Sequence, residues 1–371
     1  MSAVFRSLSG ETSRRVLLAL MLGAGLTACA VPNRVSVVSE GGLLPSLVEG
    51  RYSNLYRGKQ QYPHTCSEDC YPVREELQCE TPSPASACRY VGTRPGLKDK
   101  TGFSLQWHGH ASFSITTPDG KQLLIDPVSE QFDWPVNWAY SLFGGSSRVA
   151  PPTLGVAEFA RADAVLYSHL HYDHFNKRDL EKVGANAEFL VPPGMAEYFP
   201  DQGYLIKEVY WFSSVKIGDT EIQGMPAHHF NSRYWVPFIY DDHEKALWSG
   251  WLLKHGGKTL FFAGDTGYSR HFADIRARVG AIDICLLPIA SYHHATEGAW
   301  YRHVHTTPED ALAAAKDLGC KLLIPWGYGK HSWGMGDISS HAPLQRLLKE
   351  YPAQGQDIPL LILNEGERVA L

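Results

Sequence analysis

The chain of 371 residues lacks long hydrophobic runs beyond its N-terminus, and it lacks a strong excess of charge of either sign. A helix that spans a bilayer needs about 18 or more apolar residues in a row, so nothing after the N-terminus is expected to cross a membrane. The net charge of −5 gives no reason to expect a nucleic acid as a partner. With 44 % apolar residues, the chain can instead bury one large core or two modest ones.

The N-terminus itself has the pattern of a bacterial lipoprotein signal. Arg14 and Arg15 precede the apolar run VLLALMLGAGL, and the small residues of LTAC end at Cys29. The run is shorter than a membrane helix, as in a cleaved secretory signal. LTAC resembles a lipobox, which implies a signal peptide over residues 1–28 and a lipid on Cys29. An ordinary signal peptide with an incidental cysteine is the alternative.

The residues around this signal bear on the location of the protein. Ala30, in place of an aspartate, resembles the sorting pattern of outer-membrane lipoproteins. We therefore expect a lipid-anchored protein of the bacterial cell envelope, on the outer membrane and facing the periplasm. The segment SRRVLLA loosely resembles a twin-arginine signal but lacks its usual Phe and Lys, so general and twin-arginine export both stay open.

The cysteines fit an exported protein, and the sequence lacks the paired cysteines of a zinc knuckle. Four of them lie close together, at Cys66, Cys70, Cys79 and Cys88. Their separations of three, eight and eight intervening residues do not match the Cys-x2-Cys spacing of structural zinc sites. Two disulfides are expected instead, with three possible connectivities. Cys285 and Cys320 lie in apolar runs and are expected to pack as small hydrophobic residues.

The composition of the chain changes near residue 103. Residues 29–102 are rich in Pro, Gly, Ser and charge without sustained periodicity, which indicates a tether and a Cys-containing N-terminal extension. Over residues 103–371, short β-like runs such as KTLFFAGD and DICLLPIA alternate with a few helical ones. Many strands, with helices between some of them, predict a layered α/β domain.

One helix is well marked, over residues 307–318. Thr307 can serve as its N-cap and Pro308 fits its first position. Asp310 falls at the third position, where it can complete a capping box. Gly319 follows the last apolar residue and is typical of a helix end.

Several of the expected strands end in side chains that bind metal ions. The run DAVLYSH ends in His169, and His171 lies two positions on, so in extended backbone both point the same way and can hold one ion. Asp173 and His174 follow where the chain can turn, and can hold a second ion. Imidazole and carboxylate ligands suit Zn, and also Fe or Mn.

Two later segments repeat this arrangement. FFAGD ends in Asp265 after Gly264, a residue that allows a close approach of the backbone. MPAHHF places His228 and His229 after another short apolar segment. Because sites form where loops leave strand ends, these side chains are expected to meet the first group.

These motifs resemble a known family. HLHYDH resembles the His-x-His-x-Asp-His signature of the metallo-β-lactamase superfamily. QWHGHASFSI, LLIDP, MPAHHFNSR, ALWSGWLL, FFAGDTGY, LLPIASY and HTTPEDA follow in the order expected for the branch that contains N-acyl-phosphatidylethanolamine phospholipase D. The resemblance covers residues 103–371 and implies an αββα sandwich with two metal ions at one edge.

The resemblance also implies a role for each site residue. One ion would be held by His169, His171 and His229. The second would be held by Asp173 and His174, with Asp265 bridging both ions. His305, in HTTPEDA, matches a histidine near the reaction centre that is not a ligand in the family, and a residue that merely precedes a helix cap is the alternative. Two divalent ions, with zinc favoured and iron or manganese open, are the expected cofactors.

The chain departs from the family at one position. The family supplies a last histidine to the second ion directly before a Trp-Gly pair, whereas here Pro325 precedes Trp326 and Gly327. A prolyl ring has no donor atom for a metal. His331, His303 or water could complete the second site, and the choice among them stays open.

The implied activity is that of a metal-dependent hydrolase. A metal-bound hydroxide, oriented by Asp265, would attack phosphorus or a carbonyl carbon, and His305 would assist the leaving group. We expect a phosphodiesterase that acts on phospholipid, with no nucleic acid as partner and an oligomeric state that the sequence leaves open. The alternatives are a lactone or carboxylic-ester hydrolase of the same fold, and a non-catalytic lipoprotein whose metal site is degraded at Pro325.

Overall fold

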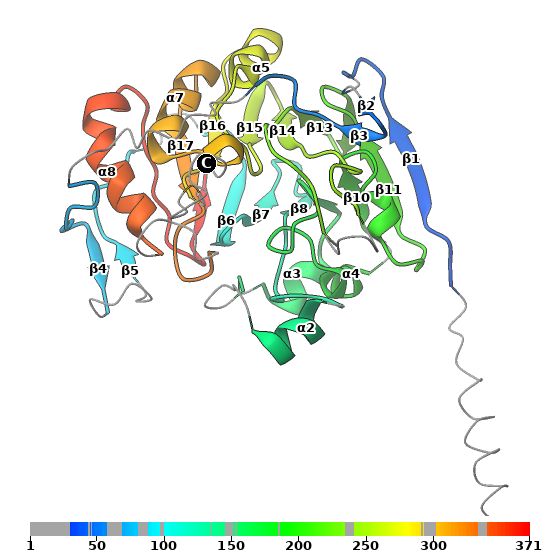
Figure 1. Ribbon diagram of the computed structural model, residues 1–371. Coiled ribbons are helices and arrows are strands. Elements are labelled where there is room, and N and C mark those ends of the chain that lie inside the picture. The colour runs from blue at the N-terminus through cyan, green and yellow to red at the C-terminus, as the bar shows by residue number, and fades with distance from the viewer. Residues whose placement is uncertain are drawn as a thin grey trace, which may run out of the picture.

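Figure 1 shows the computed structural model of the chain. The structure describes residues 30–43, 45, 47–57, 69–80, 88–96, 100–134, 136–144, 151–152, 154–184, 186–233, 241–290, 292, 302–332 and 340–371. The expected signal peptide over residues 1–28, its lipid-bearing Cys29 and the extension cysteine Cys66 lie outside these residues. No helix in the described ranges has the length and apolar character needed to cross a bilayer.

The first sheet has eight strands among the described residues, with β6, β7 and β8 antiparallel and β8 to β1 parallel. Their spatial order is β1 (Arg34–Val38), β11 (Leu205–Val209), β10 (Glu188–Val191), β9 (Ala164–Leu166), β8 (Gln122–Ile125), β7 (Ser112–Thr116), β6 (Ser104–Gly109) and β18 (Arg368–Ala370). The edge strands β1 and β18 come from the N-terminal and C-terminal parts of the chain. Both of these parts therefore belong to the same sheet.

The second sheet has six strands in the described part of the chain. Their order is β12 (Ser214–Ile217), β13 (Thr220–Met225), β14 (Gly250–His255), β15 (Lys258–Phe262), β16 (Ile284–Pro288) and β17 (Leu323–Trp326). One core fills the space between the sheets, where Phe113 of β7 meets Phe262 of β15 with ring centroids 5.9 Å apart. The two sheets therefore pack face to face.

Helices cover the outer face of each sheet (Figure 1). On the second sheet they are α5 (His271–Val279), α7 (Pro308–Leu318) and α8 (Ala342–Gln354). On the first sheet α3 (Val156–Ala160) and α4 (Lys177–Val183) pack over a separate apolar cluster, to which Tyr198 of the short helix η1 (Ala196–Tyr198) also belongs. The layers run helix, sheet, sheet, helix, which confirms the predicted αββα architecture.

The predicted helix at 307–318 is confirmed as α7. The Thr307 side chain accepts a hydrogen bond from the Asp310 amide, and the Asp310 carboxylate accepts one from the Thr307 amide. Gly319 ends the helix in the left-handed conformation at φ +63°. The capping signals therefore fixed both helix ends correctly.

The N-terminal extension differs in part from the prediction. Arg34–Val38 forms β1, which pairs in parallel with β11 at the edge of the first sheet. Four of its five side chains are exposed, as is common in a short edge strand. For this reason the sequence of β1 does not show the buried face that marks a strand, and it was predicted as part of a tether. The rest of the described extension contributes two hairpins, β2 (Leu47–Val48) with β3 (Arg51–Tyr52) and β4 (Leu77–Cys79) with β5 (Cys88–Tyr90).

The disulfides agree with the prediction in the extension, and the core holds one that was not predicted. Cys79 and Cys88 are bonded across the β4–β5 hairpin, and Cys70 is also disulfide-bonded. Cys285 and Cys320 pack in the apolar core as expected, but they are bonded to each other, which was not predicted from the sequence. They meet because the chain leaves α7 at Gly319 and returns beside β16, where the Cys285 amide donates to the Leu322 carbonyl.

Candidate metal centre

The HLHYDH motif lies in the loop between β9 and α4, and other side chains hold this loop in place. Ser168 donates two hydrogen bonds to the buried carboxylate of Asp126, from its amide (2.7 Å) and its hydroxyl (2.5 Å). Asn231 accepts a hydrogen bond from the Leu170 amide. The Arg233 guanidinium donates to the carbonyls of Leu170 and Phe175 at 2.8 and 2.9 Å. The loop is thus fixed at several points before any ligand binds.

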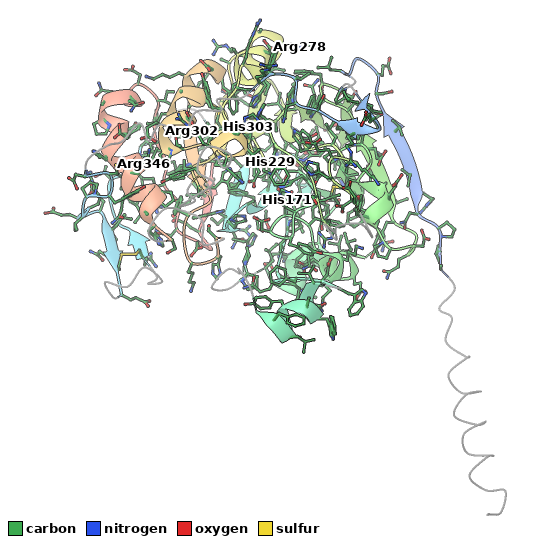
Figure 2. All side chains as sticks on the ribbon, viewed as in Figure 1. His171, His229, Arg278, Arg302, His303 and Arg346 are labelled. Atoms are coloured by element: carbon green, nitrogen blue, oxygen red, sulfur yellow. A yellow bond between two sulfur atoms is a disulfide. The ribbon has the colours of Figure 1, made fainter. Side chains whose placement is uncertain are left out.

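Three histidines form the first donor cluster. His169 Nε2 lies 2.9 Å from His171 Nδ1, and His229 Nε2 lies 3.2 Å from the same atom. Figure 2 shows His171 and His229 close together near the middle of the molecule. The Val304 carbonyl faces His229 Nδ1 at 2.9 Å, which places the proton on that nitrogen and leaves the Nε2 lone pair for a metal.

The protonation states of these histidines suit metal binding. Burial lowers the pKa of His171 to about 4 and holds the pKa values of His169 and His229 well below the usual range. The three imidazoles are therefore neutral at pH 7, the form that binds a divalent ion.

A second donor cluster lies beside the first. His174 Nε2 is 3.7 Å from Asp173 Oδ2 and 3.3 Å from Asp265 Oδ1. The Asp126 carboxylate lies 2.7 Å from His174 Nδ1 and orients that ring. His174 Nε2 is buried and has no hydrogen-bond partner among the described residues. A buried histidine nitrogen without a hydrogen-bond partner is expected where the side chain binds a metal ion, so the donor set fits a metal ion.

Burial alone would lower the pKa of His174, but the carboxylates of Asp265, Asp173 and Asp126 outweigh it and raise the pKa well above the usual value. Burial alone would raise the pKa values of Asp173 and Asp265, yet the neighbouring His174 lowers both. The negative charge of this cluster therefore attracts a cation, and a divalent metal would take the place of the proton on His174.

Asp265 joins the two clusters. While its Oδ1 faces His174, its Oδ2 lies 3.9 Å from His229 Nε2 and 3.6 Å from His305 Nδ1. The preceding Gly264 has φ +64°, and a Cβ there would lie 2.9 Å from the Ser249 carbonyl oxygen. Only glycine allows the strand end to approach so closely, and this approach brings Asp265 between the clusters.

All seven predicted site residues thus lie together. They form groups whose donor atoms lie within 4.8 Å of one another: His169, His171 and His229; His169, His174 and Asp265; His229, Asp265 and His305; and Asp173 and His174 with His110. Their roles as ligands or catalytic groups stay predictions.

Neither proposed replacement for the missing histidine joins a donor group in the described part of the chain. His331 packs beside Gly109, where a Cβ would lie only 2.7 Å from His331 Cβ. His303 Nε2 instead lies 3.3 Å from His228 Nε2.

Two site residues were missed from the sequence. Asp126 and His110 lie in LLIDP and HGHASF, which served only as marks of resemblance. The signal for Asp126 is a carboxylate directly after an apolar strand. The signal for His110 is a histidine at the tip of a tight hairpin, where turn chemistry favours Gly or Asn.

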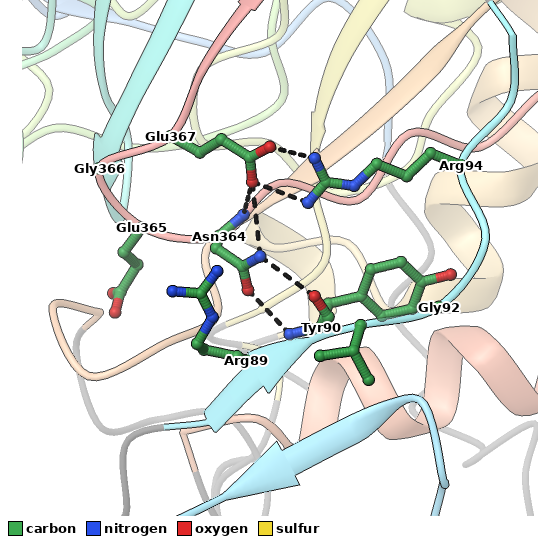
Figure 3. Close-up of a pocket in the computed structure, with 9 residues that line it drawn as sticks. Arg89, Tyr90, Gly92, Arg94, Asn364, Glu365, Gly366 and Glu367 are labelled. Carbon is green, nitrogen blue, oxygen red and sulfur yellow. Dashed lines mark hydrogen bonds and ion pairs between the residues drawn. The ribbon is translucent and has the colours of Figure 1, made fainter.

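A separate cavity of about 620 Å³ lies between the extension and the C-terminal segment (Figure 3). The Arg94 guanidinium pairs with the Glu367 carboxylate there, and Asn364 hydrogen-bonds both main-chain groups of Tyr90. None of the donor-cluster residues lines this cavity. It is a junction between the extension and the C-terminal segment, and the metal centre is the better candidate for chemistry.

Comparison with known proteins agrees with these observations. The profile of the β-lactamase superfamily domain matches residues 121–328. An uncharacterised protein of Mycobacterium tuberculosis is 30 % identical over 287 residues, which cover 73 % of this chain and 69 % of the relative. An N-acyl-phosphatidylethanolamine-hydrolyzing phospholipase D of Caenorhabditis elegans is 26 % identical over 283 residues, covering 72 % of this chain and 74 % of the relative.

Among solved structures, a possible metal-dependent hydrolase from Veillonella parvula superposes with a TM-score of 0.55. The match has 12 % sequence identity and covers 72 % of this chain and 99 % of that chain. At this identity the likeness shows the fold alone.

Proposed function

Since the chain belongs to the β-lactamase superfamily and is a metal-dependent hydrolase of that fold, we propose that it is a phosphodiesterase that cleaves phospholipids. The observation that carries the proposal is the pair of donor clusters that share Asp265. A carboxylate shared in this way would suit two cations held close together, an arrangement that supports hydrolysis of a phosphodiester.

Two divalent ions, zinc by the nitrogen and carboxylate donor set, would activate water and stabilise the charge that develops on the phosphoryl oxygens. The residues of the chain do the positioning. Asp265 presents one oxygen to each cluster and so fixes their separation. His305 Nδ1, 3.6 Å from Asp265 Oδ2, is placed to take up the proton released from water and to deliver it to the leaving alcohol.

An exposed apolar surface next to the centre supports a lipid substrate. We call it the α2 patch, and it consists of Trp134 and three residues of α2 (Val136–Phe143), namely Trp138, Leu142 and Phe143. These side chains are 54–82 % exposed, α2 has no buried residue, and residues 134–147 carry no charge. Tryptophan and apolar side chains without charge favour the interface of a bilayer.

The α2 patch is connected to the metal loop through aromatic contacts. Tyr140 of α2 packs on Phe132 with ring centroids 5.0 Å apart, and Phe132 packs on Tyr172 at 5.7 Å. Tyr172 lies between the ligand candidates His171 and Asp173 in the chain. A bilayer that contacts α2 would therefore bring phospholipid head groups near the donor clusters.

We further propose that the protein is anchored by a lipid on Cys29 in the bacterial envelope. The disulfides Cys79–Cys88 and Cys285–Cys320 support an oxidising compartment. The C. elegans relative is an N-acyl-phosphatidylethanolamine-hydrolyzing phospholipase D, which supports phospholipid as the substrate.

Release of phosphatidic acid tests the proposal. The full-length protein, purified in detergent and loaded with zinc, should release phosphatidic acid from mixed micelles that contain phosphatidylethanolamine. Asp265→Asn should abolish the release, whereas Asp274→Asn, on the outer helix α5, should leave it unchanged. Turnover of a lactone with no turnover of any phospholipid would contradict the proposal and favour an ester hydrolase. Absence of bound metal and of all turnover would favour a non-catalytic protein.

A further inference from the structure

The second donor cluster lacks one histidine that the resemblance to the family implies. The family places a histidine at the end of the strand that here is β17, but Pro325 occupies that position and its Pro ring offers no donor. We propose that His110, at the tip of the β6–β7 hairpin, supplies this missing ligand to the second ion. The inference rests on the proposed two-ion hydrolase and names a residue that completes its centre.

Distances place His110 in the second cluster. His110 Nε2 lies 2.9 Å from Asp173 Oδ2, and its ring centroid lies 5.3 Å from that of His174. The ring also contacts the indole of Trp326 with centroids 6.3 Å apart, so it lies beside the residue that follows Pro325. The imidazole therefore fills the space at the end of β17 from the opposite sheet.

With His110 the second cluster gains a further donor. His110, Asp173 and His174 have donor atoms within 4.8 Å of one another, and Asp265 Oδ1 lies 3.3 Å from His174 Nε2. Two nitrogens and two carboxylate oxygens give four donors, the number that zinc prefers in proteins. Without His110 the same cluster has three donors.

The backbone at His110 supports a role for its side chain. The hairpin closes with Gly109 opposite Ser112, so only two residues form the turn. His110 has φ +47°, a left-handed conformation that is uncommon for residues other than glycine. A histidine kept in such a conformation points to a function that outweighs the backbone preference.

The ring is buried, and in the described part of the chain its packing uses only one of its two nitrogens. His110 is 3 % exposed, and its Nδ1 has no hydrogen-bond partner within the described ranges. The Trp107 indole hydrogen-bonds the His110 carbonyl rather than the ring. Among the residues that the structure describes, the ring hydrogen-bonds only Asp173, which is itself a ligand candidate.

Three variants of the full-length protein test the inference, with bound zinc counted by elemental analysis and the site read by the visible absorption of the cobalt-substituted protein. His110→Gln keeps an amide near the position of Nε2 and can still hydrogen-bond Asp173, but it is a poor zinc ligand. His110→Asn suits the left-handed turn and is too short to reach the ion. His331→Gln is the matched control, because it keeps the Cβ that packs on Gly109.

We expect two equivalents of zinc in the native protein and in His331→Gln, and one equivalent in both His110 variants. The affinity for the second equivalent should fall more than 100-fold, beyond the roughly 10- to 100-fold loss seen when only a supporting contact to a ligand is removed. The metal-free His110→Asn protein should melt no lower than the native one, which shows that the metal is lost without loss of the fold.

Rescue gives a further check. Pro325→His in the His110→Asn background restores the family's ligand and should return the second equivalent. Two equivalents in His110→Gln with an unchanged cobalt spectrum would overturn the inference, because His110 would then only position Asp173. Loss of the second equivalent in His331→Gln but not in His110→Gln would move the role to His331. A native protein that binds no second ion would instead contradict the proposed function.

Discussion

At the scale of single residues, Arg233 is the side chain that most constrains the metal loop. Its guanidinium forms an ion pair with the buried Asp133, and it also lies 4.0 Å from the centroid of the Tyr172 ring. Together with its bonds to the Leu170 and Phe175 carbonyls, these contacts hold both ends of HLHYDH. None of these contacts requires the metal, so the loop is prepared before the ions bind.

Arg233→Met should therefore lower both stability and metal affinity. The change leaves Asp133 buried without its partner and frees two carbonyls, which should cost about 3–5 kcal/mol of unfolding free energy. Denaturant titration of the metal-free protein checks this, and chelator competition checks the metal. Arg278→Met, at an exposed position of α5, is the matched control and should change stability by less than about 0.5 kcal/mol. Equal losses in both variants would contradict the role of Arg233.

Glu365 gives the molecule a pH dependence outside the metal centre. Burial raises the pKa of its carboxyl to about 7, although the amides of His331 and Lys330 donate hydrogen bonds to it. The folded protein then binds a proton more tightly than the unfolded chain. The resulting stabilisation is present below the usual glutamate pKa and is lost as pH rises through about 7.

Glu365→Gln should remove this dependence. Between pH 5 and pH 8 the unfolding free energy of the native protein should fall by about 1–3 kcal/mol more than that of the variant. Urea titrations of both metal-free proteins across this range measure the difference. Glu367→Gln is the control, because hydrogen bonds from Arg94 outweigh burial and lower the pKa of Glu367, so its contribution is lost toward acid pH. Parallel pH curves for Glu365→Gln and the native protein would refute the assignment.

At the scale of elements, the Cys285–Cys320 disulfide closes the segment that carries His305 and α7. The two cysteines are 35 residues apart and both are buried. The bond reduces the conformational freedom of the unfolded chain over this segment. The segment includes His305, which faces Asp265 in the site.

Cys285→Ala with Cys320→Ala should lower the unfolding free energy by about 3–4 kcal/mol, the loop-closure contribution of a segment of this length. Unfolding in guanidinium with and without a reducing agent measures it. The reducing agent should destabilise the native protein beyond its effect on the double variant. An equal effect of the reducing agent on both proteins would show that this bond contributes nothing.

The sequence predicted those elements whose signals are local. HLHYDH and the caps of α7 specify their own structure over a few residues, so the helix ends were predicted correctly and the side chains of the loop lie close together as expected. The contact of His110 with Asp173 joins residues 63 positions apart, and nothing near either residue indicates it. The Cys285–Cys320 bond was not predicted for the same reason. Each cysteine lies in an apolar run, and such a run indicates a buried residue without indicating its partner. β1 was read as linker because an edge strand with exposed side chains lacks the buried face that marks a strand.

At the scale of the whole molecule, the sheets bring distant segments to one edge, whereas α2 lies outside the layers. Figure 1 shows α2 below α3 and α4, away from both sheets. The α2 patch contributes no residue to either described core. Its apolar side chains are therefore available for contact with a membrane.

Replacing Trp134, Trp138 and Phe143 by serine should therefore reduce membrane binding without unfolding the protein. Each of these side chains would contribute about 1.5–3 kcal/mol when it enters the bilayer. Partition of the variant into phospholipid vesicles should therefore fall at least tenfold. Co-sedimentation with vesicles measures it, and turnover of a short-chain, water-soluble phosphodiester should be unchanged. Leu47→Ser with Val48→Ser, equally exposed on β2, is the control. An equal fall in the control would contradict a specific role for the α2 patch.

The place where β1 begins has a consequence for orientation. Val31 already hydrogen-bonds Asp201, so a lipid on Cys29 would be tied to the body by only a few residues. In Figure 1 the start of β1 and α2 both lie on the lower side of the molecule. Two separated points of attachment would stop the enzyme from tumbling and leave it only lateral diffusion, with one side always turned to the bilayer. Its encounters would then depend on the number of lipids per unit area rather than on their concentration in solution.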